Sequence, residues 1–165
     1  MYNTKRLILK PFTKKDLPAF QTIMADPRIG AWLAKPEGLS PETSRMMLER
    51  FQDHWKNYGY GTFAVFDKET ENLLGYCGLK FDKRFGAPEI LYALDADYWG
   101  MGYISEAGKK VLEVAANEWD IDKVVSFTLP NNLASQAVMK KLGLVYSRNI
   151  IHADLDHVFF ERSLR

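Results

Sequence analysis

The segment from residue 89 to residue 107 constrains this chain more than any other. It reads Glu-Ile-Leu-Tyr-Ala-Leu-Asp-Ala-Asp-Tyr-Trp-Gly-Met-Gly-Tyr-Ile-Ser-Glu-Ala. An apolar strand is predicted to end near Leu94, a loop carries Gly100 and Gly102, and apolar residues then recur at helical spacing from about Ile104. Glycines allow close approach to the backbone, and the first N–H groups of a helix are unpaired donors at its positive end. The segment therefore predicts a binding site for a phosphate group.

Composition limits the kind of protein that carries this site. The chain has 165 residues, 47% of them hydrophobic, which favours a single folded domain over residues 1–165. With 22 basic and 21 acidic residues, its net charge of +1 gives no overall field that attracts nucleic acid or an anionic membrane. The single cysteine, Cys77, excludes an internal disulfide and is expected to be a core residue rather than a reactive thiol. We find no signal-peptide pattern and no apolar run of about 20 residues, and expect a cytoplasmic protein.

Hydrophobic patterns and turn residues predict a mixed α+β domain. Asp26-Pro27 is expected to end the first helix, and Ser40-Pro41 to begin the second. Helices are predicted at residues 13–24, 40–58, 104–119 and 132–141, and strands at 5–10, 62–67, 73–81, 89–94, 123–129, 145–152 and 157–164. This order predicts one mostly antiparallel, twisted sheet of six to seven strands flanked by about four helices.

The glycine pair alone does not identify the phosphate ligand. A dinucleotide fingerprint needs a third Gly or Ala, but Ala107 falls two positions too late, and no acid ends the strand at 123–129. A Walker-type loop is excluded because no Gly-Lys-Ser/Thr follows. Both common nucleotide-binding motifs are therefore absent. The glycine turn and the helix start that follows it still favour binding of an anion.

A second motif lies downstream, at residues 130–146. It reads Pro-Asn-Asn-Leu-Ala-Ser-Gln-Ala-Val-Met-Lys-Lys-Leu-Gly-Leu-Val-Tyr. This segment resembles the Asn-x-x-Ser/Ala…Lys-Leu-Gly-Phe segment of the GNAT acetyltransferases. Together with Tyr98-Trp-Gly-x-Gly-Tyr-x-Ser-Glu-Ala107 and Thr4-Lys-Arg-Leu-Ile-Leu-Lys-Pro-Phe-Thr13, it resembles the branch that acetylates the N-termini of ribosomal proteins. The three motifs keep their order over nearly the whole chain.

The resemblance implies acetyl-coenzyme A as cosubstrate and an acyl-CoA N-acyltransferase fold, whose sheet splays between the strands at 89–94 and 123–129. The pantetheine arm would lie in that gap like an added strand, with Asn132 bonding it from the other side unless Asn132 is only a helix N-cap. The pyrophosphate would lie on the N–H groups of Gly100, Met101, Gly102, Tyr103 and Ile104, and the arm on the backbone of Tyr92, Ala93 and Leu94. Asp97 stands where the family usually has Gln or Arg, and is expected to point outward.

The chemistry requires a base, because only a neutral amine attacks and alkyl ammonium groups have pKa values of about 10.4. Glu89 opens the strand that would line the thioester, where the family often carries its general base; an exposed strand-end carboxylate is the alternative. Many members place a Tyr four residues before the glycine of Lys-Leu-Gly to protonate the departing thiolate, but here that residue is Met139. Ser135, one helical turn earlier, is the provisional acid, with water as the alternative. Glu106 is explained by the helix dipole alone.

The acceptor side is the least patterned part of the chain. Trp32 and Leu33 lie between the first two helices, a region that walls the acceptor pocket in this family; exposed apolar residues without a ligand role are the alternative. His152-x-Asp154-x-Asp156-His157 falls at an expected hairpin tip, and we predict no metal site there.

These observations predict an N-acetyltransferase that transfers an acetyl group from acetyl-CoA to a primary amine by direct attack in a ternary complex. The amine remains open: a protein N-terminus or a small molecule such as a polyamine, an amino acid or a drug. The alternative function is a CoA-binding sensor or regulatory subunit that has lost catalytic activity. It stays open because Met139 stands at the position of the tyrosine that acts as the acid in many family members. We expect no nucleic-acid or membrane partner, and either a monomer or a homodimer.

Overall fold

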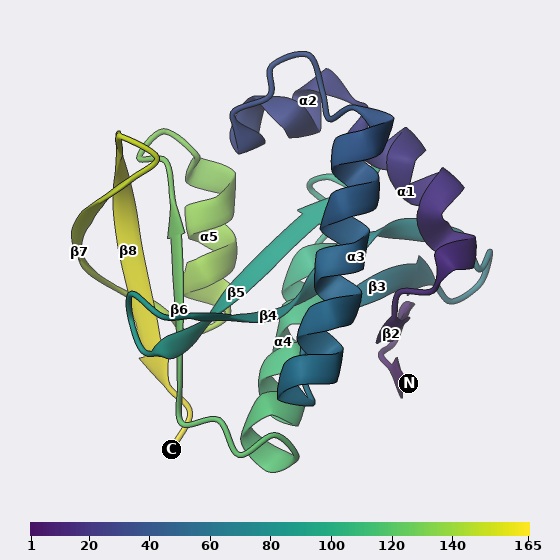
Figure 1. Cartoon of the computed structure of the whole chain (residues 1–165). Helices are drawn as coiled ribbons and strands as arrows, with labels where there is room; N and C mark the ends of the chain where they lie inside the picture. The colour runs from purple at the N-terminus through teal and green to yellow at the C-terminus, as the bar shows by residue number, and fades with distance from the viewer.

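The computed structural model describes residues 1–165 and contains one mixed sheet, with strand order β1-β2-β3-β4-β5-β6-β8-β7 (Figure 1). The strands are β1 (Tyr2–Asn3), β2 (Leu7–Pro11), β3 (Thr62–Asp67), β4 (Leu73–Asp82), β5 (Ala87–Leu94), β6 (Lys123–Thr128), β7 (Val145–His152) and β8 (Leu155–Ser163). Every neighbouring pair is antiparallel except β5 and β6. The predicted fold class is confirmed. The sheet has one more strand than expected, because two residues next to the N-terminus pair with β2.

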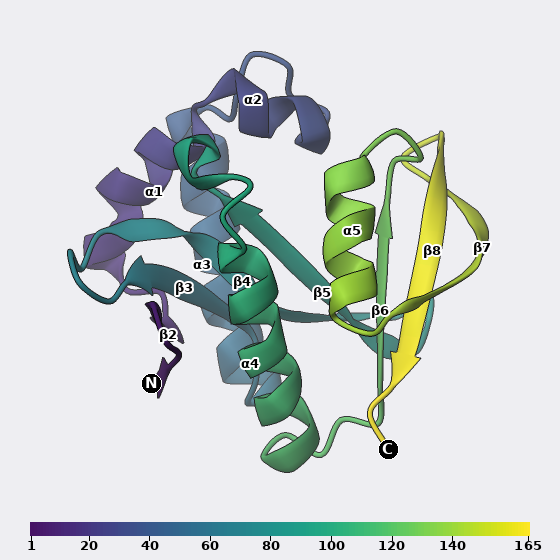
Figure 2. The same ribbon diagram turned by 180° about the vertical axis from the view of Figure 1, so that it is seen from behind.

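Helices cover both faces of the sheet (Figures 1 and 2). They are α1 (Leu17–Met24), α2 (Pro27–Gly30), α3 (Pro41–Tyr58), α4 (Tyr103–Asn117) and α5 (Leu133–Lys141), with short 3-10 turns η1 (Lys14–Asp16), η2 (Ala31–Leu33) and η3 (Ala96–Tyr98). Helices α1 and α3 lie on one face, and α4 and α5 on the other. None of the helices has the length and apolar character needed to span a membrane.

The additional helix α2 has a local cause. The carboxylate of Asp26 accepts a hydrogen bond from the N–H of Arg28 at 2.9 Å, and Pro27 occupies the first helical position. The two residues that end α1 therefore also begin a new turn of helix. The prediction of a break at Asp26-Pro27 was correct, but the helix that starts there was missed.

Each face of the sheet has its own hydrophobic core. Against α4 and α5 lies a cluster of 19 buried residues, in which Ala107, Val111 and Ala115 of α4 have no exposed surface. Against α1 and α3 lies a second cluster of 11, which includes Leu48 and Phe51 of α3. Cys77 belongs to the first cluster, where burial raises the pKa of its thiol to about 12, so it is a core residue as predicted.

The sheet opens between β5 and β6. Strands β4 and β5 pair continuously from Gly75↔Leu94 to Asp82↔Ala87, whereas β5 and β6 are in register only at Glu89↔Val125. Beyond that pair the two strands diverge toward their carboxyl ends, above which α2 lies (Figures 1 and 2). The expected splay is therefore confirmed, with Glu89 at the point where it begins.

Candidate functional site

A glycine turn precedes α4, and we call residues 100–104 the phosphate turn. Gly100 and Gly102 have φ values of 77° and 79°, in the left-handed region that favours glycine. Gly102 is the N-cap of α4, and no side chain caps the helix. A Cβ built on Gly100 would meet no atom within 4 Å. The first N–H groups of α4 thus lack a side-chain acceptor and border open space, which fits a bound phosphate group.

An ionic network joins the amino-terminal segment to this turn. One carboxylate oxygen of Glu106 accepts hydrogen bonds from Thr4 Oγ1 at 2.6 Å and from the N–H of Arg6 at 2.7 Å. The other oxygen accepts from Arg6 Nε at 2.7 Å, while Arg6 Nη1 donates to the carbonyl of Met101 at 2.9 Å. Burial alone raises the pKa of Glu106, but the hydrogen bonds from Thr4 and Arg6 and the charge of Arg6 together lower it, so Glu106 is ionised. Glu106 therefore does more than the dipole role expected of it.

The edge of β5 that faces the splay is defined by strand alternation. The carbonyl of Ile90 points toward β6, where it accepts a hydrogen bond from Ser126 Oγ at 3.0 Å. Alternate residues face the same way, so the N–H and C=O of Tyr92 and the N–H of Leu94 also point into the splay. The carbonyl of Leu94 accepts from the indole N–H of Trp99 at 2.8 Å. The backbone of Ala93 faces β4 instead, because its carbonyl oxygen lies 2.1 Å from the position that a Cβ on Gly75 would take.

Glu89 occupies the only β5–β6 pair. Its carboxylate makes no hydrogen bond or ion pair within the chain. Burial raises the pKa of Glu89 to about 7; Lys80 and Arg84 oppose the shift, and Asp82 adds to it. The side chain is half-buried, so it is largely desolvated but still reachable. This environment is unlike that of an exposed strand-end carboxylate.

Two hydroxyl groups meet on the other face of the sheet. The phenol of Tyr92 lies 2.8 Å from Ser135 Oγ and donates to the Ser135 carbonyl at 3.2 Å, which links β5 to α5. Met139 is only 1% exposed and belongs to the core. Sequence analysis identified Ser135 but missed the Tyr92 side chain. The alternation of β5 was the available signal, because it places Tyr92 and Glu89 on opposite faces.

Asn132 is the N-cap of α5, and its Oδ1 accepts a hydrogen bond from the N–H of Ser135 at 3.1 Å. The capping role is confirmed. The amide nitrogen Nδ2 makes no hydrogen bond within the chain, so one donor of this side chain is unpaired. The second role of Asn132, toward a ligand, stays a prediction.

The segment between α1 and α3, residues 26–39, contains α2 and η2 and carries the residues predicted for the acceptor side, and we call it the acceptor segment. Trp32 and Leu33 lie in η2 with 40% and 36% of their surfaces exposed. Arg28 pairs with Asp26 at 2.7 Å and with Asp97 at 3.0 Å, which links this segment to η3. The Asp97 side chain is 74% exposed, and it points outward as expected.

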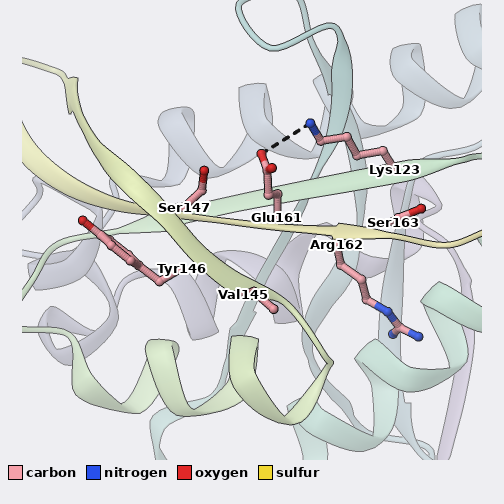
Figure 3. Close-up of a pocket in the computed structure, with 7 residues that line it drawn as sticks. All are labelled: Lys123, Val145, Tyr146, Ser147, Glu161, Arg162 and Ser163. Carbon is pink, nitrogen blue, oxygen red and sulfur yellow. Dashed lines mark ion pairs between the residues drawn. The ribbon is translucent and has the colours of Figure 1, made fainter.

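A separate pocket of about 400 Å³ lies over β6, β7 and β8 (Figure 3). The residues that line it are Lys123, Val145, Tyr146, Ser147, Glu161, Arg162 and Ser163, with Lys123 and Glu161 paired at 3.3 Å. None of the predicted site residues lines this pocket, so we assign the candidate site to the splay.

A mixed sheet that splays beside an uncapped glycine turn defines an acyltransferase-type fold. The family model described as "Acetyltransferase (GNAT) domain" matches residues 6–145. The chain therefore belongs to the GNAT acetyltransferase family.

Relatives and solved structures agree with this assignment. The chain is 29% identical over 143 residues to the uncharacterized N-acetyltransferase YnaD of Bacillus subtilis, covering 86% of this chain and 80% of YnaD. It has the fold of a putative GnaT-family acetyltransferase from Bordetella pertussis, with a TM-score of 0.85, 21% identity and 98% of both chains covered. The ribosomal-protein-S5-alanine acetyltransferase of Vibrio fischeri gives a TM-score of 0.79 at 18% identity, covering 98% of this chain and 95% of that one. The spermidine N-acetyltransferase of Vibrio cholerae, in complex with CoA and spermine, gives 0.79 at 14% identity, covering 98% and 97%.

Proposed function

We propose that this acetyltransferase moves an acetyl group from acetyl-CoA to a primary amine by direct attack in a ternary complex. The observation that carries the proposal is the position of Glu89. An unpaired, desolvated carboxylate lies at the start of the splay, where a bound thioester arm would end. A carboxyl group with a pKa near neutrality is suited to accept a proton at physiological pH.

The cosubstrate supplies an activated acyl thioester, and the chain supplies main-chain groups to hold it. The N–H groups from Gly100 to Ile104 would bind the pyrophosphate. The splay-facing backbone of Tyr92 and Leu94 would bind the pantetheine arm as an added strand, and Asn132 Nδ2 would donate to it from α5. Ala93 belongs to the same stretch, but its backbone faces β4, so we restrict the arm contacts to Tyr92 and Leu94. The N–H of Tyr92 or Leu94 would also donate to the thioester oxygen.

Glu89 would take the proton from the acceptor ammonium, directly or through a water. Its carboxylate is available for this above a pKa of about 7, and that value is close to the pKa of a protein α-amine, about 7.7–8.0. The cost of moving the proton is therefore small. The neutral nitrogen then attacks the carbonyl carbon and the C–S bond breaks. The second proton, which the nitrogen loses as the amide forms, replaces the proton that the departing thiolate takes up.

The departing thiolate would receive a hydrogen bond and a proton from Ser135 Oγ on the opposite face. When the phenol proton of Tyr92 points to Ser135 Oγ instead of to the Ser135 carbonyl, the serine O–H would be free to point into the splay. Base and acid would then flank the thioester from the two faces of the sheet. A covalent enzyme intermediate on Cys77 is disfavoured, because the thiol has no exposed surface and a pKa of about 12.

The acceptor would approach beneath the acceptor segment, against Trp32 and Leu33. Two proteins with similar folds are named for different amines, a ribosomal-protein alanine in one and spermidine in the other. A protein N-terminus and a small-molecule amine both satisfy the chemistry at Glu89, so the proposal names the primary amine as the shared class.

The test is a thiol-release assay with acetyl-CoA across a panel of amines, containing peptides with free N-termini, polyamines, amino acids and aminoglycosides. We expect saturable release of CoA with at least one amine and an acetylated product by mass spectrometry. Tight CoA binding in calorimetry with no thiol release from any amine would support the sensor function and overturn the proposed enzyme.

A further inference from the structure

Arg6 contacts Met101 and Tyr103 of the phosphate turn and lies beside Gly102, although it lies 95 positions before Met101. Its Nη1 donates to the Met101 carbonyl at 2.9 Å, and its guanidinium carbon stands 4.1 Å from the centre of the Tyr103 ring. Its Nη2 lies 3.6 Å from the position that a Cβ on Gly102 would occupy. No other side chain donates a hydrogen bond to this turn.

The bond to Met101 fixes the direction of the next N–H group. In a planar trans peptide the C=O of Met101 and the N–H of Gly102 point to opposite sides. Arg6 holds the carbonyl on its own side of the turn, so the N–H of Gly102 faces away from Arg6. Gly102 tolerates many backbone conformations, and without this hydrogen bond the peptide would be free to rotate and turn its carbonyl, a repulsive acceptor, toward a bound phosphate.

The positive charge of Arg6 is already paired with the carboxylate of Glu106. Glu106 accepts from its Nε at 2.7 Å and is itself held by Thr4 and by the N–H of Arg6. An arginine paired in this way contributes little net attraction for a phosphate, because the carboxylate beside it cancels its field at a distance. Its geometry, by contrast, is tightly defined, since a planar guanidinium contacts a carboxylate and a carbonyl at once.

We propose that Arg6 is a positioning residue for the cosubstrate: it orients the 101–102 peptide so that the phosphate turn presents N–H groups to the pyrophosphate. The inference rests on the proposed function, since it concerns binding of CoA at this turn. It assigns Arg6 an effect on CoA affinity through geometry and not through charge.

The variants Arg6→Met and Arg6→Lys separate the two effects. Methionine removes both hydrogen bonds, whereas lysine keeps the charge but is unable to bridge Glu106 and Met101 in the same plane. Arg45→Met is the matched control, because Arg45 also bridges two acceptors, here the carboxylates of Glu42 and Glu49, but lies on α3. Titration calorimetry with CoA at low and high salt measures the affinity, and circular dichroism checks folding.

We expect CoA to bind about tenfold more weakly to both Arg6 variants, as the loss of a charge-assisted hydrogen bond implies. The Arg45→Met control should bind CoA as the parent does. In the two Arg6 variants, kcat at saturating acetyl-CoA should differ from the parent value by less than threefold. If Arg6→Lys bound CoA like the parent, or if the defect appeared only at low salt, Arg6 would act by charge and the proposal would be wrong. A parent protein that bound no CoA would instead overturn the proposed function. Arg6→Lys keeps a paired cation beside Glu106, so it tests the inference even if Arg6→Met fails to fold.

Discussion

The phosphate turn and the acceptor segment are both irregular, but they are built in different ways. The turn offers main-chain N–H groups and is fixed from outside by Arg6 and Glu106. The acceptor segment has an equally defined backbone, since Cβ atoms on Gly30 and Gly38 would meet backbone oxygens at 2.0 Å, yet it presents Trp32 and Leu33 as exposed side chains. In the proposed function, the first region would bind its ligand through the backbone and the second through side chains. Only the first kind of site leaves a motif in the sequence.

The largest expected difference between the two regions is in CoA binding. Gly102→Val places a β-branched residue at a φ of 79°, which forces the turn to rearrange. CoA should then no longer raise the melting temperature, whereas saturation at 100 times Kd would stabilise the parent by about 2.7 kcal/mol.

Gly59→Val is the matched control for that variant. Gly59 ends α3 with a φ of 73°, and a Cβ there would meet no atom within 4 Å. Both variants should lose about 1–2 kcal/mol of stability from left-handed strain, but only Gly102→Val should lose the response to CoA. If CoA shifted the melting temperatures of the two variants equally, the pyrophosphate would not bind at this turn.

A smaller effect, on kcat, is expected from the hydroxyl groups of Tyr92 and Ser135. Ser135→Ala should lower kcat about tenfold with little change in either KM, because the proton is needed only as the C–S bond breaks. Tyr92→Phe should give part of the same loss, since the phenol oxygen lies 2.8 Å from Ser135 Oγ and would orient its O–H. The two losses should not add in the double variant, because both residues act through one hydrogen-bonded unit.

An unchanged kcat in Ser135→Ala would show that the thiolate departs without help from the chain. In that case the hydrogen bond from Tyr92 would serve only to hold β5 against α5, and it would appear as a stability loss in both variants.

The smallest effect should come from the acceptor segment. Trp32→Ala should raise KM for the amine about threefold to tenfold and leave the Kd for CoA unchanged, because a partly exposed aromatic residue contributes about 1 kcal/mol. Met46→Ala on α3 is the control, with 41% exposure against 40% for Trp32. A change in CoA affinity with no change in amine KM would contradict the separation of the two regions.

Sequence patterns predicted the fold well, for reasons that also explain the misses. Pro41 and Gly59 bound α3, and the 3.6-residue spacing of Ala107, Val111 and Ala115 identified α4, because local signals specify such elements. The strand β1 and the helix α2 were missed. A two-residue strand has no period to detect, and Pro27 signals the end of one helix as clearly as the start of another.

The site was only partly predictable. The glycines and Asn132 were found, since their conformations and caps are local properties. The Tyr92–Ser135 and Arg6–Met101 contacts join residues 43 and 95 positions apart, and no local pattern encodes them. The pKa of Glu89 likewise depends on its burial in the folded sheet.

The central claim is that Glu89 is the general base, and the pH dependence of kcat/KM tests it most directly. The deprotonated carboxylate accepts the proton, so the rate should rise with pH through an apparent pKa of about 7, the value set by burial of Glu89, and level off above it. Glu89→Gln should lower kcat/KM by about 10²–10⁴-fold at pH 7, lose this inflection, and approach the parent at high pH, where more of the amine is neutral. CoA affinity should not change. A Glu89→Gln enzyme with parental activity at pH 7 and the same inflection would show that another group, or water, takes the proton.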